Sequence, residues 1–216
     1  MEVNMTDKID VFTHSSIRIR GEKYTVYIDP FNIKSETKDA DFILVTHDHY
    51  DHFSVEDIKK VSNGSSILVV PGKMSEKARD AAALVSRICE VEAGSDYSID
   101  GLEFTTVPAY NDLKPFHPKN AGWVGYIVNV DGKRVYIAGD TDLTKDNRTV
   151  KCDIALVPVG GTYTMDAKKA AELVNCIKPE TAIPTHYGSI VGEEADADVF
   201  AAGVDKQIKV EIIKQY

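Results

Sequence analysis

The chain has 216 residues, of which 43% are hydrophobic and 27% are charged; this is the composition of an ordinary globular protein. Its formal net charge of -9 disfavours a nucleic-acid partner, because binding to a phosphate backbone depends on Lys and Arg. No apolar run approaches the ~20 residues that span a bilayer, and the acidic opening MEVNMTDKID is unlike a secretion signal. We therefore expect a cytoplasmic protein with a single domain over residues 1–216 and no nucleic-acid or membrane partner.

The first half of the chain predicts strands that are interrupted by two helices. The expected strands alternate in polarity or are rich in β-branched and aromatic residues: SIRIRG (16–21), YTVYIDP (24–30), DFILVT (41–46) and SSILVVPG (65–72). DFILVT is a continuous apolar run, which is typical of a strand buried on both faces. A short helix is expected over SVEDIKKV (54–61), with Ser54 as its N-cap, and a longer one over SEKARDAAALVSRI (75–88).

The second half predicts the same kind of alternation. Strands are expected at GLEFTTVPAY (101–110), CDIALVPVGG (152–161), TAIPTHYG (181–188) and IKVEIIK (208–214), with a hairpin over residues 122–142 that turns at Asp131-Gly132. Helices are expected at MDAKKAAELVNCIKP (165–179) and DADVFAAGV (196–204). Strand and helix thus alternate in both halves, which favours an α/β fold in which two mixed β-sheets are covered by helices, a four-layer αββα sandwich.

The stretch VTHDHYDHFS (45–54) holds three of the six histidines of the chain, directly after an apolar strand. In extended chain, residues two apart point to the same side, so His47 and His49 are expected to face one point. Asp51 and His52 lie where the chain turns and can converge from another side. Imidazoles and a carboxylate are ligands for zinc and similar ions, and without a metal the cluster would concentrate costly polar groups at the end of a buried strand.

HDHYDH has the form HxHxDH and resembles the signature of the metallo-β-lactamase superfamily. Three further segments resemble motifs of that superfamily and occur in the expected order: YIDPF (27–31), IAGDTD (137–142) and IPTHYG (183–188). The segment FTHSSIRI (12–19) resembles the ascorbate-phosphate lactonase-like branch, although Thr13 stands where that branch has glycine. The resemblance implies a metallo-β-lactamase-like αββα sandwich.

The resemblance also implies a set of metal ligands. His47 and His49 would bind the first ion, Asp51, His52 and His186 the second, and Asp140 would bridge the two. Asp51 and Asp140 are the expected catalytic residues, since they hold and orient a metal-bound hydroxide that attacks the substrate. Asp29 is expected to accept a hydrogen bond from a ligand imidazole. His14 can be a pocket residue or a core histidine.

The pattern fails at the third ligand of the first ion. The superfamily has a histidine after a strand that often ends in Pro-Ala, but here Tyr110 follows Pro108-Ala109. Three alternatives stay open: His117 reaches back from the following loop, Tyr110 itself binds the metal or hydrogen-bonds a metal-bound water, or the first metal site is weak.

The resemblance implies a metal-dependent hydrolase that acts on a small ester, a lactone or a phosphorylated metabolite. Two divalent ions are expected, zinc first, with manganese and iron open because the ligands are mixed nitrogen and oxygen. Lys114 and Lys119 would favour an anionic small-molecule substrate. The alternatives are a non-catalytic metal-binding protein with a degenerate first site, and a nuclease of the same superfamily, for whose usual added domain the chain has no room.

Overall fold

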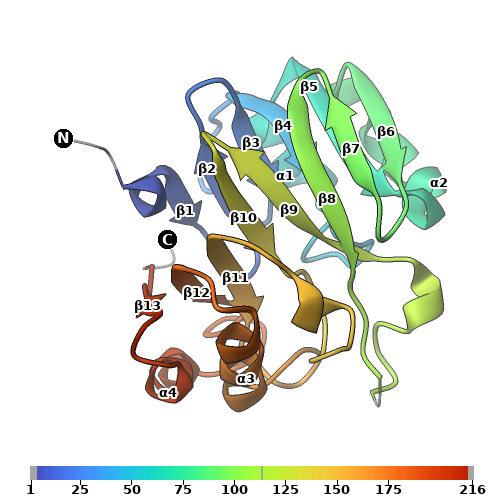
Figure 1. Cartoon of the computed structure of the whole chain (residues 1–216). Coiled ribbons are helices and arrows are strands. Elements are labelled where there is room, and N and C mark those ends of the chain that lie inside the picture. Colours follow the sequence, from blue (N-terminus) through green and yellow to red (C-terminus); the bar gives the residue numbers. More distant parts are fainter. Residues whose placement is uncertain (1–3, 113, 214–216) are drawn as a thin grey trace. The chain divides into compact units, whose positions relative to one another are not determined.

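The computed structural model describes residues 4–112 and 114–213. The chain divides into two compact units, which within the described residues comprise residues 4–91 and residues 92–213. Each unit is built on one mixed β-sheet (Figure 1). The two sheets confirm the α/β class expected from the alternation of strands and helices.

The sheet of the first unit has six strands in sequential order, β1 to β6. Their bounds are Ile9–Val11, Ile17–Arg20, Thr25–Ile28, Ala40–Leu44, Ser62–Pro71 and Arg87–Val91. Strands β1 to β3 pair antiparallel, and β3 to β6 pair parallel. Consequently β1, β3 and β4 run in one direction, and the loops that follow them lie at one edge of the sheet.

Helix α1 (Val55–Val61) covers this sheet together with the short helix α2 (Ser75–Ala78). Ile58 and Val61 of α1 pack in one buried cluster with Ile43 and Leu68 of the central strands. Ser54 caps α1 as expected, because its side chain accepts a hydrogen bond from the backbone N–H of Asp57. Four of the five residues of β4 are buried, as the continuous apolar run predicts.

The sheet of the second unit has seven strands in the order β13-β12-β11-β10-β9-β8-β7. In chain order from β7 their bounds are Asp96–Ile99, Leu102–Pro108, Val124–Val130, Lys133–Ile137, Ile154–Pro158, Thr181–Thr185 and Lys209–Val210. The pairs from β7 to β10 are antiparallel and those from β10 to β13 parallel. The β9–β10 hairpin turns at Asp131-Gly132, both with positive φ (51° and 77°), as expected.

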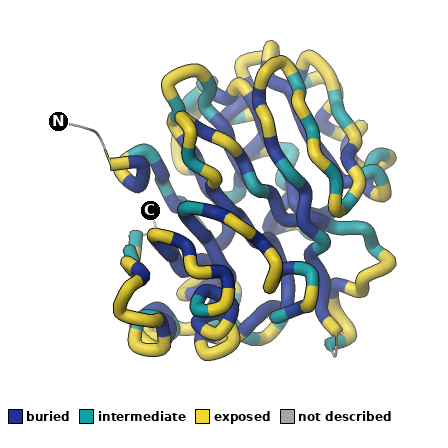
Figure 2. The backbone as a smooth tube through the Cα atoms, in the orientation of Figure 1, coloured by how far each residue is buried: buried dark blue, intermediate teal, exposed yellow. Residues whose placement is uncertain are grey.

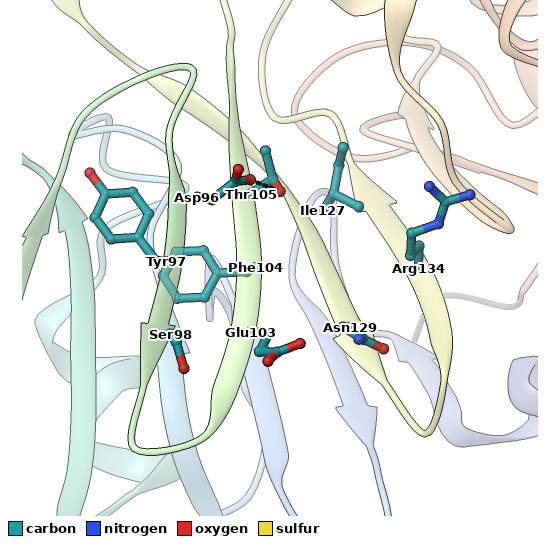
Figure 3. A pocket seen from close by; sticks show the side chains of 9 residues that line it. All are labelled: Asp96, Tyr97, Ser98, Glu103, Phe104, Thr105, Ile127, Asn129 and Arg134. Atoms are coloured by element: carbon teal, nitrogen blue, oxygen red, sulfur yellow. Dashed lines mark hydrogen bonds between the residues drawn. The ribbon is translucent and has the colours of Figure 1, made fainter.

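Helices α3 (Ala167–Ile177) and α4 (Ala195–Gly203) cover β10 to β12. Leu173, Val174 and Phe200 of the helices form one buried cluster with Ala155 and Val157 of β11. Beyond the helices, the sheet remains partly exposed, and the turns of the β7–β8 and β9–β10 hairpins are exposed (Figure 2). A shallow depression of about 450 Å³ lies on the strands there (Figure 3), lined by Asp96, Tyr97, Ser98, Glu103, Phe104, Thr105, Ile127, Asn129 and Arg134.

One predicted helix is largely wrong. Of residues 75–88, only Ser75–Ala78 are α-helical; Arg79–Leu84 form a 3-10 helix and Arg87 begins β6. Pairing of Ile67 with Arg87 in the sheet overrides the local helix propensity. Strands β1 and β7 were not predicted. No helix among the described residues is long and apolar enough to cross a membrane.

Candidate metal centre

In the first unit, the HxHxDH segment forms a tight turn directly after β4. The backbone N–H groups of His52 and Phe53 both donate to the carbonyl of His49, which folds the segment back on itself. Nε2 of His47 and Nδ1 of His49 lie 3.1 Å apart, so the two rings face one point, as their spacing predicts. Nε2 of His52 lies 3.6 Å from Asp51 Oδ2.

A buried carboxylate, Asp29, anchors this turn. Asp29 follows β3 and accepts hydrogen bonds from the backbone N–H and the hydroxyl of Thr46, at 2.7 and 2.6 Å. Its Oδ2 also lies 2.7 Å from Nδ1 of His52. Burial raises the pKa of Asp29, while the contacts with His52 and Thr46 oppose that rise. With the Nδ1 proton directed at Asp29, Nε2 of His52 is the nitrogen that presents a lone pair.

Thr46 is a site residue that the sequence reasoning missed. Its hydroxyl donates to Asp29 and lies 2.9 Å from Nδ1 of His47, so that it can accept a hydrogen bond from that nitrogen. One threonine thereby links the orientation of His47 to the carboxylate that orients His52. The signal was available in the sequence: a hydroxyl residue stands between the apolar strand and the first histidine.

His14 lies in the turn between β1 and β2, with φ +64° and no exposed surface. Its Nε2 is 3.3 Å from Oδ2 of Asp51. Because β1 runs parallel to β3 and β4, this turn lies at the same edge of the sheet as Asp29 and the HxHxDH segment. The structure therefore places His14 beside the predicted catalytic carboxylate.

In the second unit, Asp140 and two histidines meet at one sheet edge. Asp140 follows β10 and His186 follows β12, and these strands run in the same direction as β8, from whose end the loop with His117 begins. Nε2 of His117 lies 3.2 Å and Nε2 of His186 lies 3.1 Å from the same oxygen, Oδ2 of Asp140. The three side chains are 1–3% exposed.

Tyr110 points its hydroxyl at a different carboxylate. The phenol donates to Oδ2 of Asp146 at 2.8 Å and lies 3.2 Å from Nζ of Lys119, whose ammonium sits 4.4 Å from the ring centre. Burial raises the pKa of Tyr110, and the hydrogen bond to Asp146 raises it further. Both effects disfavour the phenolate that a metal ligand would require.

The two lysines expected to attract an anion are held by the protein itself. Nζ of Lys114 donates to the carbonyls of Gly161, at 3.1 Å, and Thr164. Nζ of Lys119 forms an ion pair with Asp146 at 2.8 Å. Each ammonium therefore has protein oxygens as neighbours.

The donor set fits divalent metal ions. Each unit supplies imidazoles together with a carboxylate, the mixed nitrogen and oxygen set that suits zinc, iron or manganese. Asp51 and Asp140 are both buried, and positive ions would offset the cost of burying their charges. The contact of Asp29 with His52 is the arrangement that commonly orients a metal-binding histidine. None of these residues lines the depression of Figure 3.

Comparison with known proteins shows the family of the chain. The model of the beta-lactamase superfamily domain matches residues 8–186. A UPF0173 metal-dependent hydrolase of Pyrococcus abyssi is 31% identical over 96% of this chain and 96% of its own length. The relative of the same name from Methanopyrus kandleri is 33% identical over 93% of each chain.

Solved structures show the same fold. A protein of Parabacteroides distasonis, described as a metal-dependent hydrolase, has a TM-score of 0.78 and 27% identity, over 96% of this chain and 93% of that chain. The diiron β-hydroxylase CmlA of Streptomyces venezuelae has a TM-score of 0.75 at 14% identity, over 94% of this chain and 52% of that chain; this likeness concerns the fold alone. The chain thus belongs to the beta-lactamase superfamily, among its UPF0173 metal-dependent hydrolases.

Proposed function

We propose that the protein hydrolyses a small ester, lactone or phosphorylated metabolite with the help of two divalent metal ions, for which zinc is the leading candidate. The observation that carries this proposal is the arrangement around Asp140. Two histidines from different loops place Nε2 within 3.2 Å of one buried carboxylate oxygen. A carboxylate that is shared by two metal ions needs imidazole ligands close to it, as Asp140 has.

The proposed ligands are those that the resemblance to the superfamily implies. His47 and His49 would hold the first ion with His117 as the third histidine, and Asp51, His52 and His186 would hold the second, with Asp140 shared. The geometry of Tyr110 supports His117 over Tyr110, because the phenol is bonded to Asp146 whereas His117 contacts Asp140.

When bound, the ions would lower the pKa of a water molecule toward ~7, so that hydroxide is available at neutral pH. The residues of the chain have separate roles. Asp51 Oδ2 would orient the attacking water and accept its proton, and His14 Nε2, 3.3 Å away, would hold that carboxylate in place. Thr46 and Asp29 would keep His47 and His52 in one fixed orientation.

A substrate panel tests this function. Metal-free protein, reloaded with zinc, manganese or iron, should hydrolyse at least one member of a set of aryl and alkyl esters, lactones and phosphomonoesters. The Asp51→Asn variant should lose most of that activity, because an amide cannot accept the proton. A matched control is Asp96→Asn, on the exposed strand β7, which should act like wild type.

The same panel separates the alternative of a metal-binding protein without turnover. Such a protein would retain its metal and hydrolyse no member of the set under any metal. Hydrolysis that survives in Asp51→Asn, or that needs no metal, would contradict the proposed roles.

A further inference from the structure

The loop between β8 and β9, described over residues 109–112 and 114–123, carries His117, and Asn111 in this loop donates hydrogen bonds to three backbone carbonyls. The backbone N–H of Asn111 donates to the carbonyl of His117 at 2.8 Å, which closes the loop six residues later. His117 has a positive φ of 56°, a conformation that non-glycine residues adopt only at a cost. Such a conformation persists only where the surroundings enforce it.

The side chain of Asn111 forms two hydrogen bonds that can hold this conformation. Its amide Nδ2 donates to the carbonyl of Phe116 at 3.0 Å and to the carbonyl of Tyr163 at 2.7 Å. The first bond holds the residue before His117, and the second ties the loop to the segment after β11. Two carbonyl acceptors require the NH2 group and not the oxygen on this side, so the amide orientation follows from the contacts.

Asn111 acts on the backbone of the loop rather than on the ring of His117. Its Nδ2 is 3.3 Å from His117 Nδ1, the longest of its three side-chain contacts, and an amide has only two N–H groups. A neutral imidazole that coordinates a metal through Nε2 carries its own proton on Nδ1. The two carbonyl bonds are therefore the contacts that can set the position of His117.

A second tie restrains the same loop. Nζ of Lys114 donates to the carbonyls of Gly161 and Thr164. The Asn111 amide donates to a carbonyl of the same segment. Asn111 is 5% exposed, and the Lys114 side chain is 23% exposed. The more buried of the two contacts is also the one next to the histidine.

We propose that Asn111 is a positioning residue that holds His117 where it can bind the first metal ion. His117 would then serve as the third histidine ligand, since Tyr110 stands at the sequence position where the superfamily has that histidine. The inference rests on the proposed function, because it takes His117 as a ligand. Asn111 would set the affinity for the first ion and leave the affinity for the second unchanged. Partners that orient a ligand commonly change metal affinity by about 10–100-fold when they are removed.

The test is a titration of metal-free full-length protein with cobalt(II), followed by the visible absorption of the bound ion, with the two affinities obtained by chelator competition. Asn111→Asp keeps the shape of the side chain and removes both donors. It should weaken the first ion about 10–100-fold and leave the second at the wild-type value. Asn129→Asp, at the exposed position of strand β9, is the matched control and should bind both ions like wild type.

A double variant separates positioning from a general structural role. If Asn111 acts through His117, then Asn111→Asp in the His117→Ala background should bind metal like His117→Ala alone. A further loss in that background would overturn the inference, as would wild-type affinity of Asn111→Asp for both ions. Asn111→Ser creates no buried charge, and it repeats the cycle if circular dichroism shows that the aspartate variant does not fold.

The outcome for His117→Ala alone distinguishes this inference from the proposed function. If His117→Ala binds both ions like wild type, His117 is not a ligand and the ligand assignment itself fails. If His117→Ala loses the first ion while both Asn111 variants keep it, the ligand assignment stands and the role of Asn111 is wrong.

Discussion

At the scale of single residues, the candidate site depends on side chains that orient other side chains. Thr46 is the clearest example, since one hydroxyl contacts both Asp29 and His47. Its backbone N–H bonds the same carboxylate, so the threonine fixes Asp29 from two directions. Thr46 therefore orients the ring of His47 directly and the ring of His52 through Asp29.

Replacing Thr46 with valine removes the hydroxyl and keeps the shape. We expect Thr46→Val to weaken metal binding by about 10-fold or more, because His47 and Asp29 lose a shared partner. The measurement is a chelator competition with zinc on metal-free protein. Thr105→Val, which removes an exposed hydroxyl bonded to Asp96, is the control; an equal effect of the two changes would refute the role of Thr46.

The cysteines should differ in reactivity. Cys152 is buried, Cys89 is half-buried and Cys176 is exposed. Burial raises the pKa of Cys152 to about 12, so the thiol holds its proton at pH 8, and thiolate forms only as the pH rises toward that value. Iodoacetamide at pH 8 should label Cys176 first, as peptide mass spectrometry can show. Faster labelling of Cys152 would contradict its burial.

At the scale of secondary structure elements, strand direction places the site residues. In each sheet the candidate residues follow strands that run the same way, so their loops reach one edge. The N-terminus of α1 supports this edge in the first unit. The carboxylate of Asp57, in the first turn of α1, accepts hydrogen bonds from the backbone N–H groups of Asn32 and Ile33. These two residues lie in the loop just after Asp29.

Asp57 is thus expected to stabilise the first unit. Asp57→Ala leaves two backbone donors without their acceptor, and we predict a loss of about 2–3 kcal/mol in the free energy of unfolding. Glu56→Ala, at an exposed neighbouring position, should change it by no more than about 0.5 kcal/mol. Urea denaturation of both variants measures the difference. Equal stabilities would show that the loop does not depend on Asp57.

Local sequence signals predicted some elements well and others poorly. The capped helix α1 and the Asp131-Gly132 hairpin were predicted because Ser54 and the Asp-Gly pair determine those structures locally. The helix expected over residues 75–88 is α-helical only over Ser75–Ala78, and at its C-terminal end pairing with β5 decides the structure. Strand β7 was missed, although Asp100 and Gly101, with φ of 46° and 87°, form the same type of turn to β8.

The candidate site shows the same division. The motif residues could be named from the sequence, since HDHYDH, IAGDTD and IPTHYG are contiguous segments. The choice between Tyr110 and His117 could not be made in this way, because it depends on how a loop folds between two strands. The phenol of Tyr110 bonds to Asp146 and the amide of Asn111 bonds to the carbonyl of Tyr163, and both of these partners are distant in the sequence.

At the scale of the whole molecule, metal binding should be coupled to stability. An ion that binds only the folded chain, present at 100 times its Kd, stabilises it by about 2.7 kcal/mol. For a chain of this size that corresponds to a rise in Tm of about 5–10 °C. We expect EDTA treatment to lower the Tm by this amount per ion and zinc to restore it. Identical melting of the treated and reloaded protein would contradict a tightly bound metal.

The central claim is that His117 completes a two-metal site that Tyr110 does not. Metal content by inductively coupled plasma mass spectrometry tests it most directly, on protein purified without chelator or nickel affinity. We predict two ions per chain for wild type and for Tyr110→Phe, and a fall toward one in His117→Ala. Unchanged metal content in His117→Ala, or a loss confined to Tyr110→Phe, would contradict the claim.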